Sequence, residues 1–253
     1  MEINETIKCQ LAHRSIREFT DEPVSDEMMD QLLEVANQTA TSMGMQNTSI
    51  IWVKDPEKRR QLAAINGQEY VARAPIYLLW IVDLARPAAI FAEHGLSDVG
   101  VRTMDLFTSA FTDACLQVQN VTVAAESLGL GTTILGGVLN NPPAVIELLD
   151  LPELTFPALA LMLGHPAQDP MLKPRMAKEL RVMVDGYRRP ENWTEALKDY
   201  DAQMHTYYDL RHADKPLAAF TQQLINNYAA PHPARAGIME NIKAQGFDPA
   251  LGV

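Results

Sequence analysis

Residues 13–17 place two arginines, a histidine and a hydroxyl group within one short stretch of a chain whose formal net charge is −11. These residues are His13, Arg14, Ser15 and Arg17. A guanidinium group is costly to bury without an anionic partner, and its planar set of donors fits the oxygens of a phosphate. The stretch therefore predicts either a phosphate site or, if it stays exposed, a solvated basic turn at the end of a helix.

Two later stretches favour the phosphate site. Lys173 and Arg175 again place two cations close together, separated by a proline that restricts the backbone between them. Residues 128–137 contain four glycines, which allow a backbone to approach a flat ligand closely and to expose N–H groups to it. Together the three stretches predict basic groups for a phosphate and a glycine-lined wall for a ring.

Other motifs that carry chemistry are absent or incomplete. Residues 131–136 are not followed by the Lys-Ser/Thr pair of a phosphate-binding P-loop, and Gly129-x-Gly131 lacks the third glycine of a dinucleotide fingerprint. The six histidines are scattered without a spacing suited to zinc, so we expect no metal site. Cys115 lies in an apolar helical pattern, which favours a core position over a nucleophile. The sequence offers no acid–base team, which is typical of enzymes whose cofactor carries the redox chemistry.

The composition limits the class of protein. The chain has 253 residues, of which 47% are hydrophobic, so it can form a sizeable core in one generous domain or two small ones. Its acidic balance argues against a nucleic-acid or anionic-membrane surface, and it has no apolar run long enough to span a membrane. Two cysteines, Cys9 and Cys115, and a first stretch without the pattern of a secretory signal predict a cytoplasmic protein.

The elements that must position these residues alternate between helix and strand. Hydrophobic periodicity and capping residues predict helices over about 4–13, from Ser25 as N-cap, from Asp55-Pro56 to about 65, over 101–128 and over 142–149. Runs of β-branched and apolar residues predict strands over 49–54, 76–82, 132–135, 155–163 and 181–184. The polar segment 39–48 is expected to be a loop. The class is therefore α/β or α+β.

Two segments are expected to be buried against the main domain or a partner subunit. The helix over 101–128 is apolar over most of its circumference, so it is either a central helix or part of a subunit interface. The polar, helical segment 193–253 is too thin for a core of its own, and we expect it to wrap the main domain or a partner subunit.

At this point the sequence resembles a known family. The stretch from Ala12 to Pro23, with its His-Arg-Ser-Ile-Arg core, is similar to the N-terminal motif of the nitroreductase family. Residues 124–131, followed by Gly136-Gly137, are similar to the flavin-facing segment of the oxygen-insensitive, NADPH-linked nitroreductases and flavin reductases. Residues 163–166 and 172–175 resemble a third motif of that group. The motifs occur in the family's order from residue 1 to about residue 187.

The resemblance implies an α+β, nitroreductase-like fold, with a central mixed or antiparallel sheet flanked by helices, a C-terminal helical extension and a homodimeric assembly. It implies an FMN-binding core over 1–187 and an extension over 188–253 that wraps the core or the partner. The implied function is FMN-dependent oxidoreduction, in which NAD(P)H and then a nitroaromatic, a quinone or free flavin react by turns in a ping-pong cycle. The alternative is a non-catalytic protein whose basic clusters bind an anionic ligand or partner.

The resemblance also implies roles for individual residues. His13, Arg14, Ser15 and Arg17, with Lys173 and Arg175, would hold the ribityl phosphate. Thr41 and Gln68 would contact the flavin, and Ile134, Leu135, Gly136 and Gly137 would line its ring. A backbone N–H near Gly136 would lie close to flavin N5 and stabilise charge there. The protein itself would supply no catalytic side chain.

Arg211 is the candidate for binding the 2′-phosphate that distinguishes NADPH from NADH, because it follows the Tyr207-Tyr208 pair at the spacing of the resembling group. A solvated helix-end cation remains the alternative, since Asp209 and Asp214 lie close in sequence. The chain also departs from the group: Val138-Leu139 follows the Gly-Gly turn in place of an arginine, and Ser42-Met43-Gly44-Met45 replaces a loop of serines and a phenylalanine. These departures predict a shifted substrate preference.

Overall fold

Four strands pair into one antiparallel sheet in the order β1-β2-β4-β3, in a computed structural model that describes residues 3–212 and 215–251. The described residues form two compact units. One unit contains the residues up to Gln168 together with those from Ala234 onward, and the other contains Asp169–Pro233.

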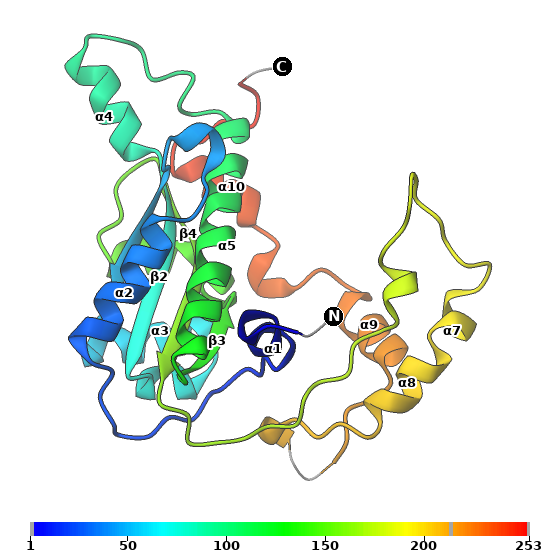
Figure 1. Ribbon diagram of the computed structural model, residues 1–253. Helices are drawn as coiled ribbons and strands as arrows, with labels where there is room; N and C mark the ends of the chain where they lie inside the picture. Colours follow the sequence, from blue (N-terminus) through cyan, green and yellow to red (C-terminus); the bar gives the residue numbers. More distant parts are fainter. Residues whose placement is uncertain (1–2, 213–214, 252–253) are drawn as a thin grey trace. The chain divides into compact units, whose positions relative to one another are not determined.

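The first unit carries the sheet and most of the helices (Figure 1). Its strands are β1 (Thr48–Trp52), β2 (Ile76–Asp83), β3 (Gly131–Leu135) and β4 (Thr155–Gly164). Its helices are α1 (Glu5–Leu11), α2 (Asp26–Asn37), α3 (Pro56–Asn66), α4 (Ala85–Glu93), α5 (Met104–Ser127), α6 (Pro142–Leu148) and α10 (Ile238–Ala244). Short 3₁₀ turns are η1 (Ser42–Gly44), η2 (Glu69–Arg73) and η3 (Gly137–Asn140), and η6 (Pro233–Arg235) crosses the boundary between the units.

The sheet has helices on both faces, which confirms the expected α+β class with a central sheet flanked by helices. Alternate residues of a strand point to opposite faces. Leu78 and Trp80 of β2 pack with α2 and α5, whereas Tyr77 and Leu79 pack with α3 and α6. The nearly continuous apolar run of β2 is thus a central strand that is buried on both sides.

The central strand β4 contains a proline, which would normally be excluded because it cannot donate a ladder hydrogen bond. Pro157 lies opposite Ile81, next to a register shift between Trp80 and Ile81. On its other side, β3 pairs only with Ala160–Gly164. The proline therefore occupies a part of β4 where one edge has no partner strand and the other is irregular.

Local signals set the helix starts. Ser25 caps α2 by accepting a hydrogen bond from Met28 N, as expected. Asp55 caps α3 in front of Pro56, and Gly67 ends it with φ of 67°. The predicted strand over 181–184 is wrong: the chain makes the turn η4 (Lys178–Leu180) and continues without a strand. Val182 and Val184 are 65% and 69% exposed, because no described strand lies beside them to pair with.

Helix α5 packs Ala114, Val118 and Val121 against the sheet with no exposed surface. Leu116 on the same helix is 49% exposed. The burial expected around nearly the whole helix is therefore wrong for the single chain, and one part of its apolar surface is open to solvent.

Residues 234–251 return to the first unit. Phe247 is fully buried, and its ring centroid lies 4.9 Å from that of Phe107. Gln245 O accepts a hydrogen bond from Leu154 N at 2.8 Å. This segment closes the end of the core formed by α5 and β4.

The second unit contains α7 (Trp193–Ala196), α8 (Lys198–Met204), α9 (Phe220–Tyr228), η4 and η5 (Leu210–His212). A small core holds it together, in which Tyr200 and Met204 of α8 pack with Phe220 of α9. The helical character expected after residue 193 is confirmed. The division after residue 187 and the wrapping of a partner subunit stay predictions. None of the described helices combines the length and apolar character needed to cross a membrane.

Candidate flavin site

Hydrogen bonds to its backbone join the basic N-terminal loop to two stretches that are far away in sequence. Ile16 N donates to Thr132 O at 2.7 Å, and Thr133 Oγ1 donates to Ile16 O. Four residues later, Thr20 N donates to His165 O at 2.9 Å. The loop therefore lies beside β3 and beyond the end of β4, so that all three sequence motifs of the resemblance meet there in part.

Ile16 anchors this loop. Its side chain is 7% exposed and packs directly on Gly131, where a Cβ atom would lie 2.7 Å from the isoleucine side chain. The lack of a side chain at Gly131 thus allows the loop to approach β3. The basic residues on either side of Ile16 are held at fixed positions as a result.

His13 is oriented by an acidic residue of α5. Its Nδ1 lies 2.7 Å from Glu126 Oε1, and Thr132 Oγ1 donates to the same oxygen at 2.7 Å. The Glu126 side chain is 12% exposed. Sequence reasoning missed this role, although an acid in the last turn of a helix is unfavourable to the helix dipole and so indicates a partner elsewhere.

Arg17 has the surroundings expected of a residue that binds an anion. Its backbone N–H donates to Gln168 Oε1 at 3.0 Å. Its side-chain Nε is buried without a hydrogen-bond partner, and no described carboxylate forms an ion pair with it. Because a half-buried guanidinium without a carboxylate needs an anion, this arginine fits a phosphate. Arg14, which is also half-buried, donates from Nη1 to Ala12 O at 3.1 Å.

The other end of β3 leads into the Gly136-Gly137 turn. A Cβ at Gly137 would lie 2.5 Å from Asn66 Oδ1, whereas one at Gly136 would meet only Arg235 Nη2 at 3.8 Å. Gly137 therefore packs inward and Gly136 has room on its open side. The glycine-rich stretch was expected to let a ligand approach the backbone closely, and the open side of Gly136 leaves room for such an approach.

Arg235 holds this turn and was not predicted. Its Nη2 donates to Gly136 O at 2.8 Å, and its Nε donates to Asn140 Oδ1 at 3.0 Å. The chain thus has an arginine at the Gly-Gly turn, although Val138-Leu139 takes the local position where the resembling group has one. A separation of 99 residues hid this contact from sequence patterns.

Gln68 lies in the same neighbourhood as the glycine turn. Asn66, which packs on Gly137, accepts a hydrogen bond through its backbone oxygen from Asn140 Nδ2 at 3.1 Å. Two residues later, the Oε1 atom of Gln68 is buried and has no hydrogen-bond partner. An acceptor without a donor in this position fits contact with a polar ring edge.

Between the two ends runs β3, whose five residues span on the order of 13 Å at about 3.3 Å per residue. Ile134 is 37% exposed and Leu135 only 2%. Ile134 can therefore line a ligand with its side chain, whereas Leu135 can do so only with its backbone. A basic end, an extended edge and a glycine end match the phosphate, ribityl chain and ring of FMN in order.

The remaining predicted contacts are Thr41, Lys173 and Arg175. Thr41 is half-buried immediately before η1, and no hydrogen bond of the described residues joins it to the basic loop or to Gly136. Lys173 and Arg175 belong to the second unit. There Lys173 Nζ lies 5.9 Å from the ring centroid of Tyr207, and Tyr200 Oη donates to Pro174 O at 3.3 Å.

Arg211, also in the second unit, binds Asp209 with two donors. Its Nε lies 2.9 Å from Asp209 Oδ1 and its Nη2 lies 2.6 Å from Oδ2. Asp209 is 5% exposed, so the pair is partly shielded from water. A nucleotide phosphate at Arg211 would have to share this guanidinium with Asp209.

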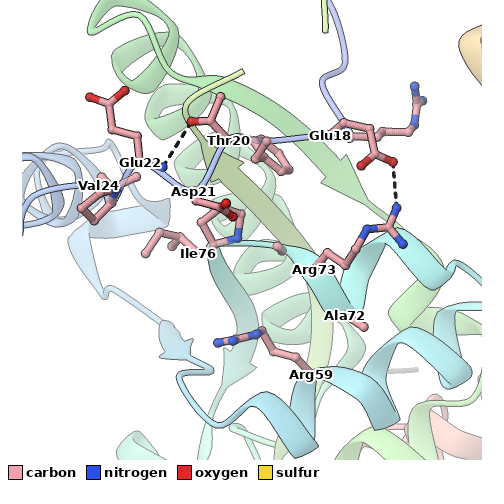
Figure 2. A pocket seen from close by; sticks show the side chains of 14 residues that line it. Glu18, Thr20, Asp21, Glu22, Val24, Arg59, Ala72, Arg73 and Ile76 are labelled. Carbon is pink, nitrogen blue, oxygen red and sulfur yellow. Dashed lines mark hydrogen bonds and ion pairs between the residues drawn. The ribbon is translucent and has the colours of Figure 1, made fainter. Parts of the chain in front are cut away.

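A separate pocket of about 560 Å³ lies beyond Arg17, between residues 17–24 and 72–76. Figure 2 shows Glu18 and Arg73 pointing toward one another across it, at 2.8 Å, with Arg59 reaching below Ile76. Arg59 Nη1 donates to the backbone oxygens of Val53 and Lys54, so its guanidinium holds the end of β1. Among the described residues, Arg17 is the one predicted flavin contact that lines this pocket.

No three described side chains of histidine, cysteine, aspartate or glutamate gather as a metal site would.

The chain is similar to flavin reductases along nearly its whole length and to a nitroreductase over most of it. The sequence profile of the Nitroreductase family matches residues 11–165, and that of the Nitroreductase family C-terminal domain matches residues 173–249. An FMN reductase [NAD(P)H] of Bacillus subtilis is 35% identical over 252 residues, which cover 97% of this chain and 98% of the relative. An oxygen-insensitive NADPH nitroreductase of Salmonella typhimurium is 37% identical over 204 residues, covering 80% of this chain and 82% of the relative.

A solved structure of similar shape is the NADPH:FMN oxidoreductase of Vibrio harveyi complexed with NAD⁺. It superimposes with a TM-score of 0.86 at 33% sequence identity, covering 96% of this chain and 98% of that one. The converging motifs, the antiparallel sheet and these matches agree, and the chain belongs to the nitroreductase family.

Proposed function

We propose that the protein is an FMN-dependent NAD(P)H oxidoreductase of the nitroreductase and flavin reductase type. The observation that carries the proposal is the arrangement along β3, where a basic loop fixed by the Ile16–Thr132 hydrogen bond lies at one end and the open backbone of Gly136 lies at the other. The relatives' names, FMN reductase and NADPH nitroreductase, support the same activity. The non-catalytic alternative finds no support in these relatives.

Several side chains would hold FMN. The phosphate would accept hydrogen bonds from the residues of the basic loop and from the second unit, namely His13, Arg14, Ser15, Arg17, Lys173 and Arg175. Thr41 and Gln68 would contact the flavin. The ring would lie along Ile134, Leu135, Gly136 and Gly137. When bound, FMN supplies the two-electron chemistry that links a nicotinamide donor to an acceptor.

The protein's part is to orient and to stabilise charge. Glu126 fixes the ring of His13, and with Nδ1 toward the carboxylate the Nε2 atom is directed to other partners. Arg235 fixes the carbonyl of Gly136 and so orients the adjoining peptide planes. A backbone N–H at this turn, together with the nearby guanidinium, would stabilise negative charge on a reduced ring without reorganisation.

NAD(P)H is the proposed electron donor, with Arg211 as the candidate for recognising the 2′-phosphate of NADPH. A nitroaromatic, a quinone or free flavin is the proposed acceptor. We also propose a homodimer, because the exposed Leu116 of α5 and the exposed Leu11 of α1 are apolar side chains that a second copy would cover. The reducing cytoplasm suits its two unpaired thiols, Cys9 and Cys115.

The test is reconstitution. Purified protein is stripped of any chromophore, titrated with FMN while flavin fluorescence is followed, and assayed for NADPH oxidation with menadione and with nitrofurazone. We expect binding of FMN and turnover with both acceptors. Arg17→Ala should weaken FMN binding, with the exposed Arg188→Ala as control. Wild-type protein that binds no FMN and oxidises no NADPH would refute the proposed function.

A further inference from the structure

A smaller pocket, of about 230 Å³, lies at the edge strand β1. It is lined by the end of α2, the first residues of β1, Arg86 at the start of α4 and Gln117 in the middle of α5. Helices α2 and α5 lie side by side on this face of the sheet (Figure 1). The strand order places β1 and β3 at opposite edges, three strand spacings or about 14 Å apart. The pocket is therefore separate from the strand along which FMN is proposed to lie.

Gln117 presents its amide nitrogen to this pocket, although the residue is only 7% exposed. Trp80 Nε1 donates to Gln117 Oε1 at 3.0 Å, and Thr48 Oγ1 donates to the same oxygen at 3.1 Å. Because an indole N–H can only donate, the contact with Trp80 fixes which end of the amide faces the core. The Nε2 atom donates to no described residue and is not enclosed, so it faces the open space that Gln117 lines.

Arg86 supplies the positive charge of the pocket. Its Nη2 donates to Gln46 O at 2.8 Å and to Thr48 O at 3.0 Å, whereas its Nε and Nη1 meet no acceptor among the described residues. Asp83 Oδ2 lies 3.6 Å from Nη2 and also accepts a hydrogen bond from Ser49 Oγ at 2.5 Å. This carboxylate balances the guanidinium charge in part. Of the described residues that line the pocket, Arg86 is the one with a formal charge.

Thr48 joins the two donor groups. Its hydroxyl binds Gln117 and its carbonyl binds Arg86, so one nearly buried residue at the start of β1 fixes both. Leu33, Ala36 and Ile50 form an apolar wall in the same pocket. Donors that the fold already holds in place bind an acceptor with little further loss of side-chain freedom. The pocket thus combines fixed donors with an apolar wall, as small-molecule sites do.

We propose that this pocket binds a small organic monocarboxylate. The carboxylate accepts hydrogen bonds from Gln117 Nε2 and from the guanidinium of Arg86, and its short carbon chain lies against the apolar wall. Pockets for drug-sized ligands measure about 300–1,000 Å³, so a volume of about 230 Å³ holds a smaller molecule. A single guanidinium that Asp83 partly balances suits a monoanion better than a dianion such as phosphate.

Butyrate and butyramide are the probes, because they share a carbon chain and differ only in the group that meets the two donors. The full-length protein, labelled with ¹⁵N, is titrated with each probe while the amide signals of residues 46–50 and 117 are followed by NMR. We expect butyrate to shift these signals with a Kd on the order of 1 mM, a typical affinity for a ligand of few atoms. Butyramide should bind about tenfold more weakly, because it lacks the charge.

Two variants and a control test the assigned donors. Gln117→Glu retains Oε1 for Trp80 and Thr48 and replaces the amide nitrogen with oxygen, so it should weaken butyrate binding about tenfold or more and reverse the preference toward butyramide, which can donate. Arg86→Gln should weaken butyrate about tenfold and leave butyramide nearly unchanged. Arg60→Gln is the matched control, because Arg60 pairs with Glu57 on the exposed side of α3 and should affect neither probe.

Wild-type protein whose amides 46–50 do not respond to about 10 mM butyrate, ten times the expected Kd, refutes the proposal. Inorganic phosphate that displaces butyrate at equal concentration also overturns it, because the pocket would then be a general anion site. If Gln117→Glu does not fold, Arg86→Gln decides, and butyrate affinity equal to that of Arg60→Gln refutes the site. Saturation with FMN should leave butyrate binding unchanged, whereas competition would place butyrate in the proposed flavin site. The titration needs no turnover, so it stands apart from the test of oxidoreductase activity.

Discussion

Glu126 Oε1 lies between His13 Nδ1 and Thr132 Oγ1, at 2.7 Å from each. The acid at the end of α5 thus ties the first basic residue of the loop to the strand along which the cofactor is proposed to lie. This contact makes Glu126 a structural partner of the proposed phosphate site rather than a surface charge.

Glu126→Gln should weaken FMN binding by about three- to tenfold, because the neutral amide is a poorer acceptor for two donors and leaves the imidazole less firmly oriented. Fluorescence titration of apoprotein with FMN measures the change. Glu93→Gln, at an exposed position on α4, is the control. Equal affinities in wild type and Glu126→Gln would remove this orienting role.

The two glycines after β3 should respond differently to alanine. Gly137→Ala should destabilise the fold by about 1–3 kcal/mol, because its new methyl group would overlap Asn66 Oδ1, and the melting temperature should fall. Gly136→Ala should leave the melting temperature of the apoprotein nearly unchanged, since only Arg235 Nη2 at 3.8 Å is near. It should instead weaken FMN binding. A Gly136→Ala variant with normal FMN affinity would place the ring elsewhere.

Stability should depend on pH through Asp113. Its folded-state pKa is raised by burial, so its contribution to stability is fully present below the pKa of the unfolded chain and is lost as pH rises through the folded-state value. Asp113→Asn should therefore gain melting temperature relative to wild type as pH rises from about 4, the ordinary range of aspartate, toward neutrality. Thermal melts at a series of pH values measure this, with Thr112→Ala as the control. A difference that does not change with pH would show that Asp113 is ionised equally in both states.

The exposed side of α5 should be a subunit interface. Leu116→Arg places a charge on that surface, so it should convert the proposed homodimer into monomers at micromolar concentration, as measured by light scattering. Leu96→Arg, at a leucine that is 60% exposed after α4, should leave the assembly unchanged. A stable wild-type monomer would count decisively against the dimer.

Arg211→Ala should raise the KM for NADPH several-fold and leave that for NADH nearly unchanged, if Arg211 binds the 2′-phosphate. Arg211 already pairs with Asp209 through two donors, which limits the size of the effect on the KM for NADPH. Removing the arginine also takes these donors away from the carboxylate of Asp209, which is nearly buried. Steady-state kinetics with both donors separate the outcomes. An equal effect on NADPH and NADH would assign Arg211 to the structure of the second unit.

Local chemistry made much of the fold predictable. Asp55-Pro56 and Gly67 gave the bounds of α3, Ser25 gave the start of α2, and the apolar run at 76–82 gave the central strand β2. Helix α4 was not among the expected elements. It starts after Leu84 without a side-chain cap, so no capping residue marks its start in the sequence.

The roles predicted for the basic loop and the glycine turn stay predictions, and the side chains that hold these two segments were not predicted. Residue types and order identified the basic loop and the glycine turn, because phosphate and ring recognition restrict which side chains can serve. Glu126 contacts His13, 113 positions away, and Arg235 contacts Gly136, 99 positions away. Asp113 accepts a hydrogen bond from Ser42 N, 71 positions away. Such pairs depend on the packed fold and leave no periodic trace in one sequence.

The return of residues 234–251 to the first unit has a consequence for synthesis on the ribosome. Phe247 fills the space beside Phe107 and Phe156, so the apolar end of α5 stays uncovered until that residue has been made and has emerged. The nascent chain must therefore hold an incomplete core through translation of the whole second unit. Messages truncated before residue 247 yield products that expose aromatic surface, which chaperones and proteases recognise.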